Sequence, residues 1–323
     1  MSRVLLTGGD GFLGSAIRAS FAQRDDVSLL EIVRPGAGTR ASEGSCEADL
    51  TSTESVGAIL RRLRPSVVVH AVGRVMGTPE ELHRDNVVTT IAVAEAILRD
   101  SPETVLVVLG SAAEYGLRST ATPISETDEC EPVGAYGHAK RECFLALDRL
   151  RASGLRCNYL RIFNPIGPGI RHQVVGSFLQ KAATVLSQPE PRIVPMGNLD
   201  SVRDFIPTRD VASFVVGLSL LGEWGHTINV CSGRGFLVRE IIDRLAALCG
   251  SPLVIESHGP APELLYSIGD AARSAAIARR FPGSERPTSI DYALKDAWNY
   301  MLGGQSRLDA MDAPSSPPAD SLA

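Results

Sequence analysis

A glycine-rich turn near the start of the chain constrains the fold more than any other feature of the sequence. A short apolar strand is predicted over 3–6 before the turn, and a helix over 12–24 after it. The turn satisfies two overlapping spacings, G-x-G-x-x-G and G-x-x-G-x-x-G, through Gly8, Gly9, Gly11 and Gly14. Glycines allow a tight turn, close approach of the backbone to a pyrophosphate, and close packing of helix on strand. Because the helix would present free N–H groups to the anion, the segment predicts a phosphate-binding βα unit.

Strand and helix signals alternate along the first half of the chain. Further strands are predicted over 27–33, near 49, and over 67–69, 105–109 and 158–162. Helices are predicted over 53–64, 82–99 and 136–151. Thr51 or Ser52 is expected to cap the first of these three helices, and Pro65 to end it. Continuous apolar strands separated by helices are typical of a parallel sheet covered on both faces, so we expect a doubly wound α/β fold.

The sequence changes in character after residue 164, where a segment rich in Gly and Pro runs over 164–169. We therefore predict a ligand-binding sheet domain over 1–164 and a smaller α/β substrate-binding region over 165–302. The second region contains a clear helix over 238–248, and some of its chain is expected to return to the sheet. The last segment, 303–323, is rich in Gly, Ser, Pro, Asp and Ala and is predicted to be a disordered tail.

The composition excludes several classes of protein. With 323 residues the chain can bury a large core without a disulfide or metal, and its net charge of −5 with no basic stripe disfavours nucleic acid as a partner. The six cysteines form no C-x-x-C pair, so no metal site is predicted and the thiols are expected to be reduced. No apolar run resembles a signal peptide or approaches the ~18 residues of a membrane helix. A cytoplasmic protein without membrane contact is expected.

The end of the second strand should select between the two nicotinamide dinucleotides. A carboxylate there binds the ribose 2′-hydroxyl of NAD, whereas an arginine accepts the 2′-phosphate of NADP. By strand register Val33 stands where the carboxylate is expected, and Arg34 follows it, which favours NADP(H). Glu31 would instead favour NAD(H) if the register is shifted, and Asp10 adds a negative charge near the turn.

Three residues form a candidate catalytic set. Tyr136 and Lys140 are four residues apart on a predicted helix and therefore share one face. Ser111 follows the strand over 105–109, at the end of the strand where ligands of such sheets bind. A tyrosine hydroxyl can exchange a proton with a carbinol or carbonyl oxygen, a nearby ammonium stabilises the phenolate, and a serine hydroxyl can hold the same oxygen. The set predicts hydride transfer between a nicotinamide and the carbon that bears this oxygen.

With these motifs the chain resembles the extended short-chain dehydrogenase/reductase family, in its branch of nucleotide-sugar epimerases, dehydratases and 4-ketoreductases. The resemblance covers about residues 3–302 and rests on Thr7–Gly14, Asp49–Leu50, His70–Gly73, Asp85–Thr90 with Asn86, Gly110–Gly116, Arg161–Gly169 and Ser201–Ile206. It implies a Rossmann-type domain over 1–164. It also implies cofactor contacts at Gly8, Gly11, Phe12, Leu13, Gly14, Arg34, Asp49, Leu50, Ala71, Val72, Gly73 and Lys140.

The same resemblance implies how the substrate and a second subunit bind. Ser111 and Tyr136 would contact the sugar, while Asn164 and Arg203 would hold the diphosphate of a nucleotide sugar; an arginine fork suits phosphate oxygens. A homodimer is expected through a four-helix bundle made from the helices over 82–99 and 136–151.

Two departures from the family pattern restrict the reaction. Dehydratases of this branch carry an Asp-Glu pair directly after the catalytic Ser or Thr, but Ala112 and Ala113 stand here and Glu114 is one place further on. The segment 259–270 also lacks the arginine that usually precedes its Gly-Asp. We therefore favour a reductase of a 4-keto-6-deoxy nucleotide sugar. A 4-epimerase that retains NAD and a non-catalytic dinucleotide sensor are the alternatives, and the base, the sugar and the stereochemistry are left open.

Overall fold

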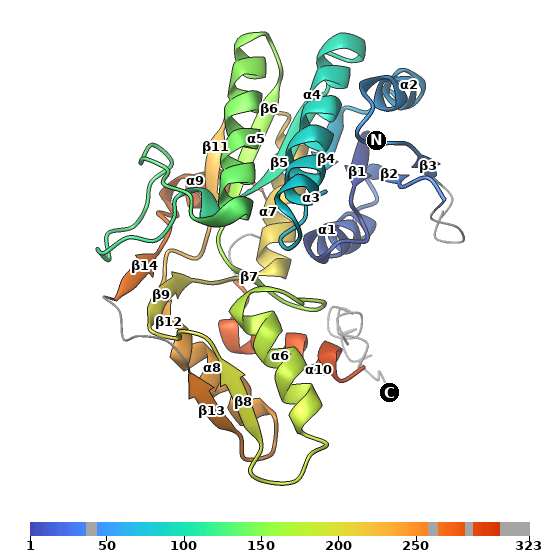
Figure 1. Ribbon diagram of the computed structural model, residues 1–323. Coiled ribbons are helices and arrows are strands. Elements are labelled where there is room, and N and C mark those ends of the chain that lie inside the picture. Colours follow the sequence, from blue (N-terminus) through green and yellow to red (C-terminus); the bar gives the residue numbers. More distant parts are fainter. Residues whose placement is uncertain (37–43, 258–263, 282–286, 304–323) are drawn as a thin grey trace, which may run out of the picture.

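A seven-stranded sheet forms the centre of the computed structural model, which describes residues 1–36, 44–257, 264–281 and 287–303 (Figure 1). In spatial order its strands are β11 (Thr227–Val230), β6 (Cys157–Ile162), β5 (Val105–Ser111), β4 (Val67–His70), β1 (Ser2–Thr7), β2 (Val27–Val33) and β3 (Ser45–Glu47). All six pairings are parallel. The strand order reverses between β1 and β4, which is the point where doubly wound sheets bind ligands. The expected α/β fold is confirmed.

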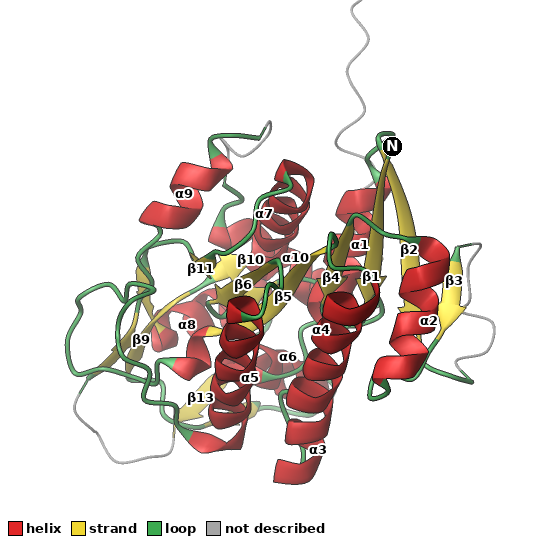
Figure 2. Ribbon diagram, turned by 90° about the horizontal axis from the view of Figure 1, so that it is seen from above, coloured by secondary structure: helices red, strands yellow, loops and turns green. Residues whose placement is uncertain are grey.

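Helices cover both faces of this sheet (Figure 2). On one face lie α1 (Phe12–Ala22), α7 (Thr208–Leu221) and α9 (Ala272–Ala278), and on the other α2 (Thr53–Leu63), α4 (Thr89–Asp100) and α5 (Gly134–Ala152). Successive residues of β1 serve the two faces: Val4 and Leu6 belong to the first hydrophobic core and Leu5 to the second. Because side chains alternate along a strand, an all-apolar strand can fill both cores at once.

A second layer of structure lies beyond the carboxyl ends of the strands (Figure 1). It contains α6 (Gln173–Val185), α8 (Val238–Leu248), α10 (Ile290–Met301), β7 (Pro165–Ile166), β8 (Ile193–Met196), β9 (Ser201–Asp204), β10 (Ile206–Pro207), β12 (Gly235–Leu237), β13 (Val254–Ser257) and β14 (Leu265–Ser267). Its own hydrophobic core is built around Phe178, Ile241 and Trp298, all at most 4% exposed. The helix predicted over 238–248 is confirmed as α8.

The chain after residue 164 contributes to both layers. Helix α7 packs on α1, and β11 pairs with β6 at the edge of the sheet. Within the described ranges, no helix combines the length and the apolarity needed to cross a membrane. The predicted tail over 303–323 lies outside the described residues, apart from Gly303.

One predicted helix differs from the structure at its start. Instead of beginning at Leu82, the helical segment begins with α3 (Pro79–His83), continues through a π turn, η2 (Arg84–Val88), and ends with α4. Thr78 explains the earlier start, because its hydroxyl accepts from the Glu81 amide in a capping box. A similar cap identifies Ser52, rather than Thr51, as the N-cap of α2.

Candidate active site

The glycine turn has the geometry of an anion cradle. Gly8 adopts a φ of +75°, and its carbonyl oxygen accepts from the Gly11 amide at 2.9 Å. A Cβ on Gly14 would lie 1.9 Å from that oxygen, so only glycine allows α1 to pack so closely on the turn. Gly11 caps α1 with no side-chain hydrogen bond, which leaves N–H groups of the first turn available to a phosphate. The turn therefore fits the pyrophosphate of a dinucleotide.

The carboxylate of Glu31 lies against the turn, although strand register points to position 33, where Val33 stands. A Cβ on Gly9 would lie 2.1 Å from Glu31 Oε1, so this side chain covers the turn. Glu31 is 14% exposed and 3.9 Å from Arg18, and burial raises the pKa of its carboxyl while Arg18 opposes that rise. The expected and observed positions differ because of the strand pairing. Glu31 pairs with Leu6, near the end of β1, whereas Val33 lies beyond the last residue of β1 that is paired.

The remaining expected cofactor residues separate into two groups. Ala71, Val72 and Gly73 follow β4 and line the central cavity; a Cβ on Gly8 would meet the Val72 amide nitrogen at 2.8 Å. Asp49 and Leu50 line neither this central cavity nor a second cavity, which adjoins it along the start of α1. The Asp49 carboxylate is engaged locally, since the Thr51 amide and hydroxyl both donate to it and lower the pKa of its carboxyl.

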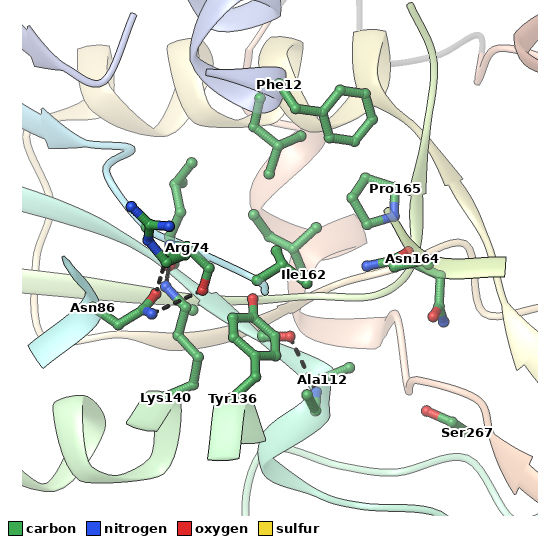
Figure 3. A pocket seen from close by; sticks show the side chains of 18 of the residues that line it. Phe12, Arg74, Asn86, Ala112, Tyr136, Lys140, Ile162, Asn164, Pro165 and Ser267 are labelled. Carbon is green, nitrogen blue, oxygen red and sulfur yellow. Dashed lines mark hydrogen bonds between the residues drawn. The ribbon is translucent and has the colours of Figure 1, made fainter. Parts of the chain in front are cut away.

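The central cavity, of about 410 Å³, is lined by all three predicted catalytic residues. Its walls include Gly11, Phe12, Leu13, Gly73, Ser111, Tyr136, Lys140, Asn164, Arg203 and Ser267. Tyr136 and Lys140 extend side by side from α5 into this space (Figure 3). The Lys140 ammonium lies 6.0 Å from the centroid of the Tyr136 ring and donates to the Leu109 carbonyl at 3.0 Å. The arrangement places an acid–base hydroxyl beside a fixed positive charge.

The sequence predicted no functional role for two further residues at the cavity, Asn86 and Gln173. Asn86, in the π turn, is fully buried; its side chain donates to the Arg74 carbonyl at 2.9 Å and accepts from the Arg74 amide at 3.3 Å. It therefore fixes the loop after β4. Gln173 adopts a φ of +63° and lines both cavities. Such backbone in a non-glycine residue is strained, and strain of this kind clusters at ligand sites.

Asn164, Arg203 and Ser267 form the far end of the cavity, in the second layer. The Asn164 side chain donates to the Asp204 carbonyl at 2.7 Å. Arg203 is half-buried, and its Nε donates a hydrogen bond to Ser201 Oγ at 3.3 Å. Among the described residues no carboxylate lies within ion-pair distance of its guanidinium, and burial lowers the pKa of Arg203. Because a partly desolvated cation without a countercharge is unfavourable, this end of the cavity is suited to an anion.

A second cavity, of about 980 Å³, continues from the first along the start of α1. Its basic wall residues are Arg18, Arg34, Arg74, Arg171 and His172, against the acidic Asp10 and Asp85. Arg34 is exposed here. The two cavities share Gly11, Phe12 and Gly73, so together they offer a continuous path for an elongated ligand across the switch point of the sheet.

Comparison with known proteins agrees with this geometry. The family model "NAD dependent epimerase/dehydratase family" matches residues 4–231. The dTDP-6-deoxy-L-talose 4-dehydrogenase (NAD(P)(+)) of Kitasatospora kifunensis is 27% identical over 267 residues, which cover 81% of this chain and 83% of that protein. The UDP-glucose 4-epimerase of Corynebacterium glutamicum is 26% identical over 332 residues, covering 94% of this chain and 98% of that protein.

A solved structure extends the similarity to three dimensions. RMD from Pseudomonas aeruginosa, complexed with NADPH, superimposes with a TM-score of 0.78 and 25% sequence identity, and the match covers 94% of this chain and 99% of that one. The family model alone spans more than half of the sequence. The chain therefore belongs to the NAD-dependent epimerase/dehydratase family of extended short-chain dehydrogenases/reductases.

Proposed function

We propose that this enzyme reduces the keto group at C4 of a 4-keto-6-deoxy nucleotide sugar to the alcohol. The observation that carries the proposal is a single cavity with Ser111, Tyr136 and Lys140 at one end and the unpaired Arg203 at the other. A sugar carbonyl at the first end and a diphosphate at the second match the chemistry of these side chains. The 4-dehydrogenase of Kitasatospora kifunensis, among the relatives, supports the same reaction class.

Each side chain of the set has a separate task in this reaction. When bound, the nicotinamide supplies the hydride. Tyr136 gives its phenolic proton to the carbonyl oxygen as that oxygen becomes an alkoxide, and the Lys140 ammonium stabilises the phenolate that is left. Ser111 donates a hydrogen bond to the same oxygen. The glycine turn and the start of α1 would hold the cofactor's pyrophosphate, and Ala71 to Gly73 would lie under the rest of the dinucleotide.

Dehydration is disfavoured in this proposal because no carboxylate stands among the described residues that line the central cavity. Ala112 and Ala113 line the cavity at the positions of the dehydratase carboxylates. Glu114, the next residue, is fully buried and paired with Arg161 at 3.1 Å. It is not among the residues that line the cavity, so it cannot replace the missing pair.

A 4-epimerase that retains NAD is the second candidate, and the position of Glu31 over the turn favours it. Both activities use the same catalytic set, so cofactor exchange separates them. The test follows absorbance of reduced nicotinamide while dTDP-, GDP- and UDP-linked 4-keto-6-deoxy sugars are offered with NADH or NADPH. A reductase consumes one reduced cofactor per sugar. Protein that purifies with stoichiometric NAD and interconverts two epimers without added cofactor would establish the epimerase instead.

Cofactor preference depends on Glu31 and Arg34, and we propose that Glu31 dominates. A 2′-phosphate beside this little-exposed carboxylate should cost about 1–2 kcal/mol, or roughly tenfold in affinity. This supports use of NAD(H), against the NADP(H) preference expected from Arg34. Glu31→Gln should therefore raise the NADPH/NADH ratio of kcat/KM by about tenfold, whereas Arg34→Ala, at an exposed position, should lower it by no more than a few-fold. The reverse ranking of the two variants would return the main role to Arg34.

We also propose that α4 and α5 form the interface of a homodimer. On α5 Leu145 is 42% exposed, and on α4 Ile91 and Leu98 are half-buried, as is Val88 at the end of η2. Exposed and half-buried apolar side chains that gather along two neighbouring helices are suited to contact a partner subunit. Sedimentation at micromolar concentration should give a dimer, and Leu145→Glu should dissociate it. A wild-type chain that sediments as a monomer would contradict the proposal.

A further inference from the structure

Glu114 is the centre of a buried polar network directly behind the catalytic serine. Its side chain is 0% exposed, in the short helix η3 (Ala112–Glu114) that follows β5. Oε1 accepts from the Ser111 amide at 3.2 Å and from the Tyr159 hydroxyl at 2.7 Å. Oε2 accepts from Arg161 Nε at 3.1 Å. Both carboxylate oxygens therefore accept hydrogen bonds from the protein, and bulk water does not reach the buried carboxylate.

The arginine that faces Glu114 is itself fixed. Arg161, 1% exposed, donates through Nη1 to the Tyr115 hydroxyl at 2.8 Å and to the Glu126 carbonyl at 3.1 Å. Its guanidinium lies 4.6 Å from the ring centroids of both Tyr115 and Phe144. The Tyr115 hydroxyl in turn donates to Asn229 of β11. Because these contacts fix the Arg161 guanidinium, they also fix the Glu114 carboxylate that pairs with it.

The same network reaches the helix that carries the other two catalytic residues. The Tyr159 hydroxyl, which donates to Glu114, also lies 3.0 Å from the carbonyl oxygen of Lys140. The Tyr159 ring packs on β5 so closely that a Cβ on Gly110 would lie 2.3 Å from its Cε1. One carboxylate therefore connects the backbone of Ser111 to the backbone of α5 at Lys140.

We infer that Glu114 is a positioning residue, which holds Ser111 and the Tyr136–Lys140 helix in register for proton transfer. This inference rests on the proposed function. Glu114, Tyr159 and Arg161 are absent from the residues that line the cavity, so they act through the catalytic set and touch no substrate. A buried ion pair is a poor source of stability but constrains geometry, because both partners must be satisfied at once.

Glu114→Gln tests the inference sharply, since an amide has one acceptor oxygen and one donor group. If the oxygen faces Arg161, the NH₂ group opposes the Ser111 amide, and the Tyr159 hydroxyl has to turn from Glu114 to the Lys140 carbonyl. If the side chain is turned around, the NH₂ group opposes the guanidinium. Either orientation breaks one side of the network. We expect kcat per cofactor-binding site to fall about ten- to thirtyfold, because small displacements of reacting groups are costly, while KM changes less than about threefold.

Two features separate positioning from a loss of folded protein. Turnover is divided by the number of NADH sites, measured by fluorescence titration, and the kinetic isotope effect with NADH deuterated at the transferred position should rise because the chemical step becomes slower. Asp210→Asn is the matched control: Asp210 accepts from the Thr288 amide and hydroxyl far along the chain and lines neither cavity. It should lower the melting temperature without changing turnover per site or the isotope effect. Unchanged turnover per site in Glu114→Gln would overturn the inference.

A second variant and a substrate-free measurement keep the test independent of the proposed reaction. Tyr159→Phe preserves the Glu114–Arg161 pair and removes only the hydroxyl that reaches Lys140, so it stays informative if Glu114→Gln does not fold; it should lower turnover per site about three- to tenfold. Hydrogen exchange of the amides over 110–114 should accelerate in Glu114→Gln and not in Asp210→Asn. If the wild type reduces no 4-keto sugar, the proposed function fails alone; if exchange is unchanged in Glu114→Gln, the positioning inference fails.

Discussion

Tyr136→Phe should lower turnover by at least about 100-fold and leave cofactor affinity and the fold intact. The substitution removes one oxygen from a half-buried side chain whose ring can keep its packing. Without that hydroxyl the developing alkoxide has no proton donor of its own, and the Lys140 ammonium, which donates to Leu109, would have to supply charge stabilisation alone. The loss should therefore fall on kcat, with little change in the KM for the sugar.

The measurement compares Tyr136→Phe with Tyr292→Phe, which removes the same atom from an exposed residue of α10. Turnover, NADH affinity and melting temperature are recorded for both. The control should match the wild type in all three. A Ser111→Ala/Tyr136→Phe double variant should be little worse than Tyr136→Phe alone, because residues that act as one unit lose their contribution together. Near-wild-type turnover in Tyr136→Phe would remove Tyr136 from the catalytic set.

The parts of the fold with strong local signals were predictable from the sequence. The strands β4 and β5 are nearly continuous runs of apolar residues, and β2 and β6 are mostly apolar. Helix α8 combines an apolar stripe with polar residues on its other face. The short pairings β7 with β10 and β9 with β12 and β14 were not predicted. Strands of two to four residues carry almost no periodic signal, and their partners are decided by how the second layer packs.

The residues of the candidate site likewise fall into those that local sequence predicts and those that depend on distant partners. The glycine turn and the Tyr-x-x-x-Lys pair are local spacings, so a helix or turn suffices to place them. Glu31 was weighed but not preferred, because its distance from the turn depends on how β2 pairs with β1. The role of Glu114 could not be read from the sequence at all, since its partners, Tyr159 and Arg161, come from a strand more than forty residues away.

Arg203→Ala should weaken the binding of nucleoside diphosphates by roughly 1.5–3 kcal/mol, about ten- to a hundredfold in Kd. The guanidinium has no carboxylate partner among the described residues, and burial already disfavours its charge. A diphosphate would supply the missing countercharge at an end of the cavity where Ser267, not an arginine, stands beside Arg203 on the neighbouring strand. Since Arg203 is the cation that the described residues place at this end of the cavity, we expect a large share of the diphosphate affinity to depend on it.

Calorimetric titration of UDP, dTDP and GDP, with Arg239→Ala as the control, would measure this effect. Arg239 lies in the same layer but is paired with Asp200 at 3.6 Å and lines neither cavity, so its removal should leave the three affinities unchanged. Stability should move in a different direction from binding: because Arg203 is an unpaired cation, its loss should not lower the melting temperature of the ligand-free protein. Equal affinities in wild type and Arg203→Ala for all three nucleotides would contradict the nucleotide-sugar proposal, since the cavity would then hold its anion without the half-buried cation proposed to receive it.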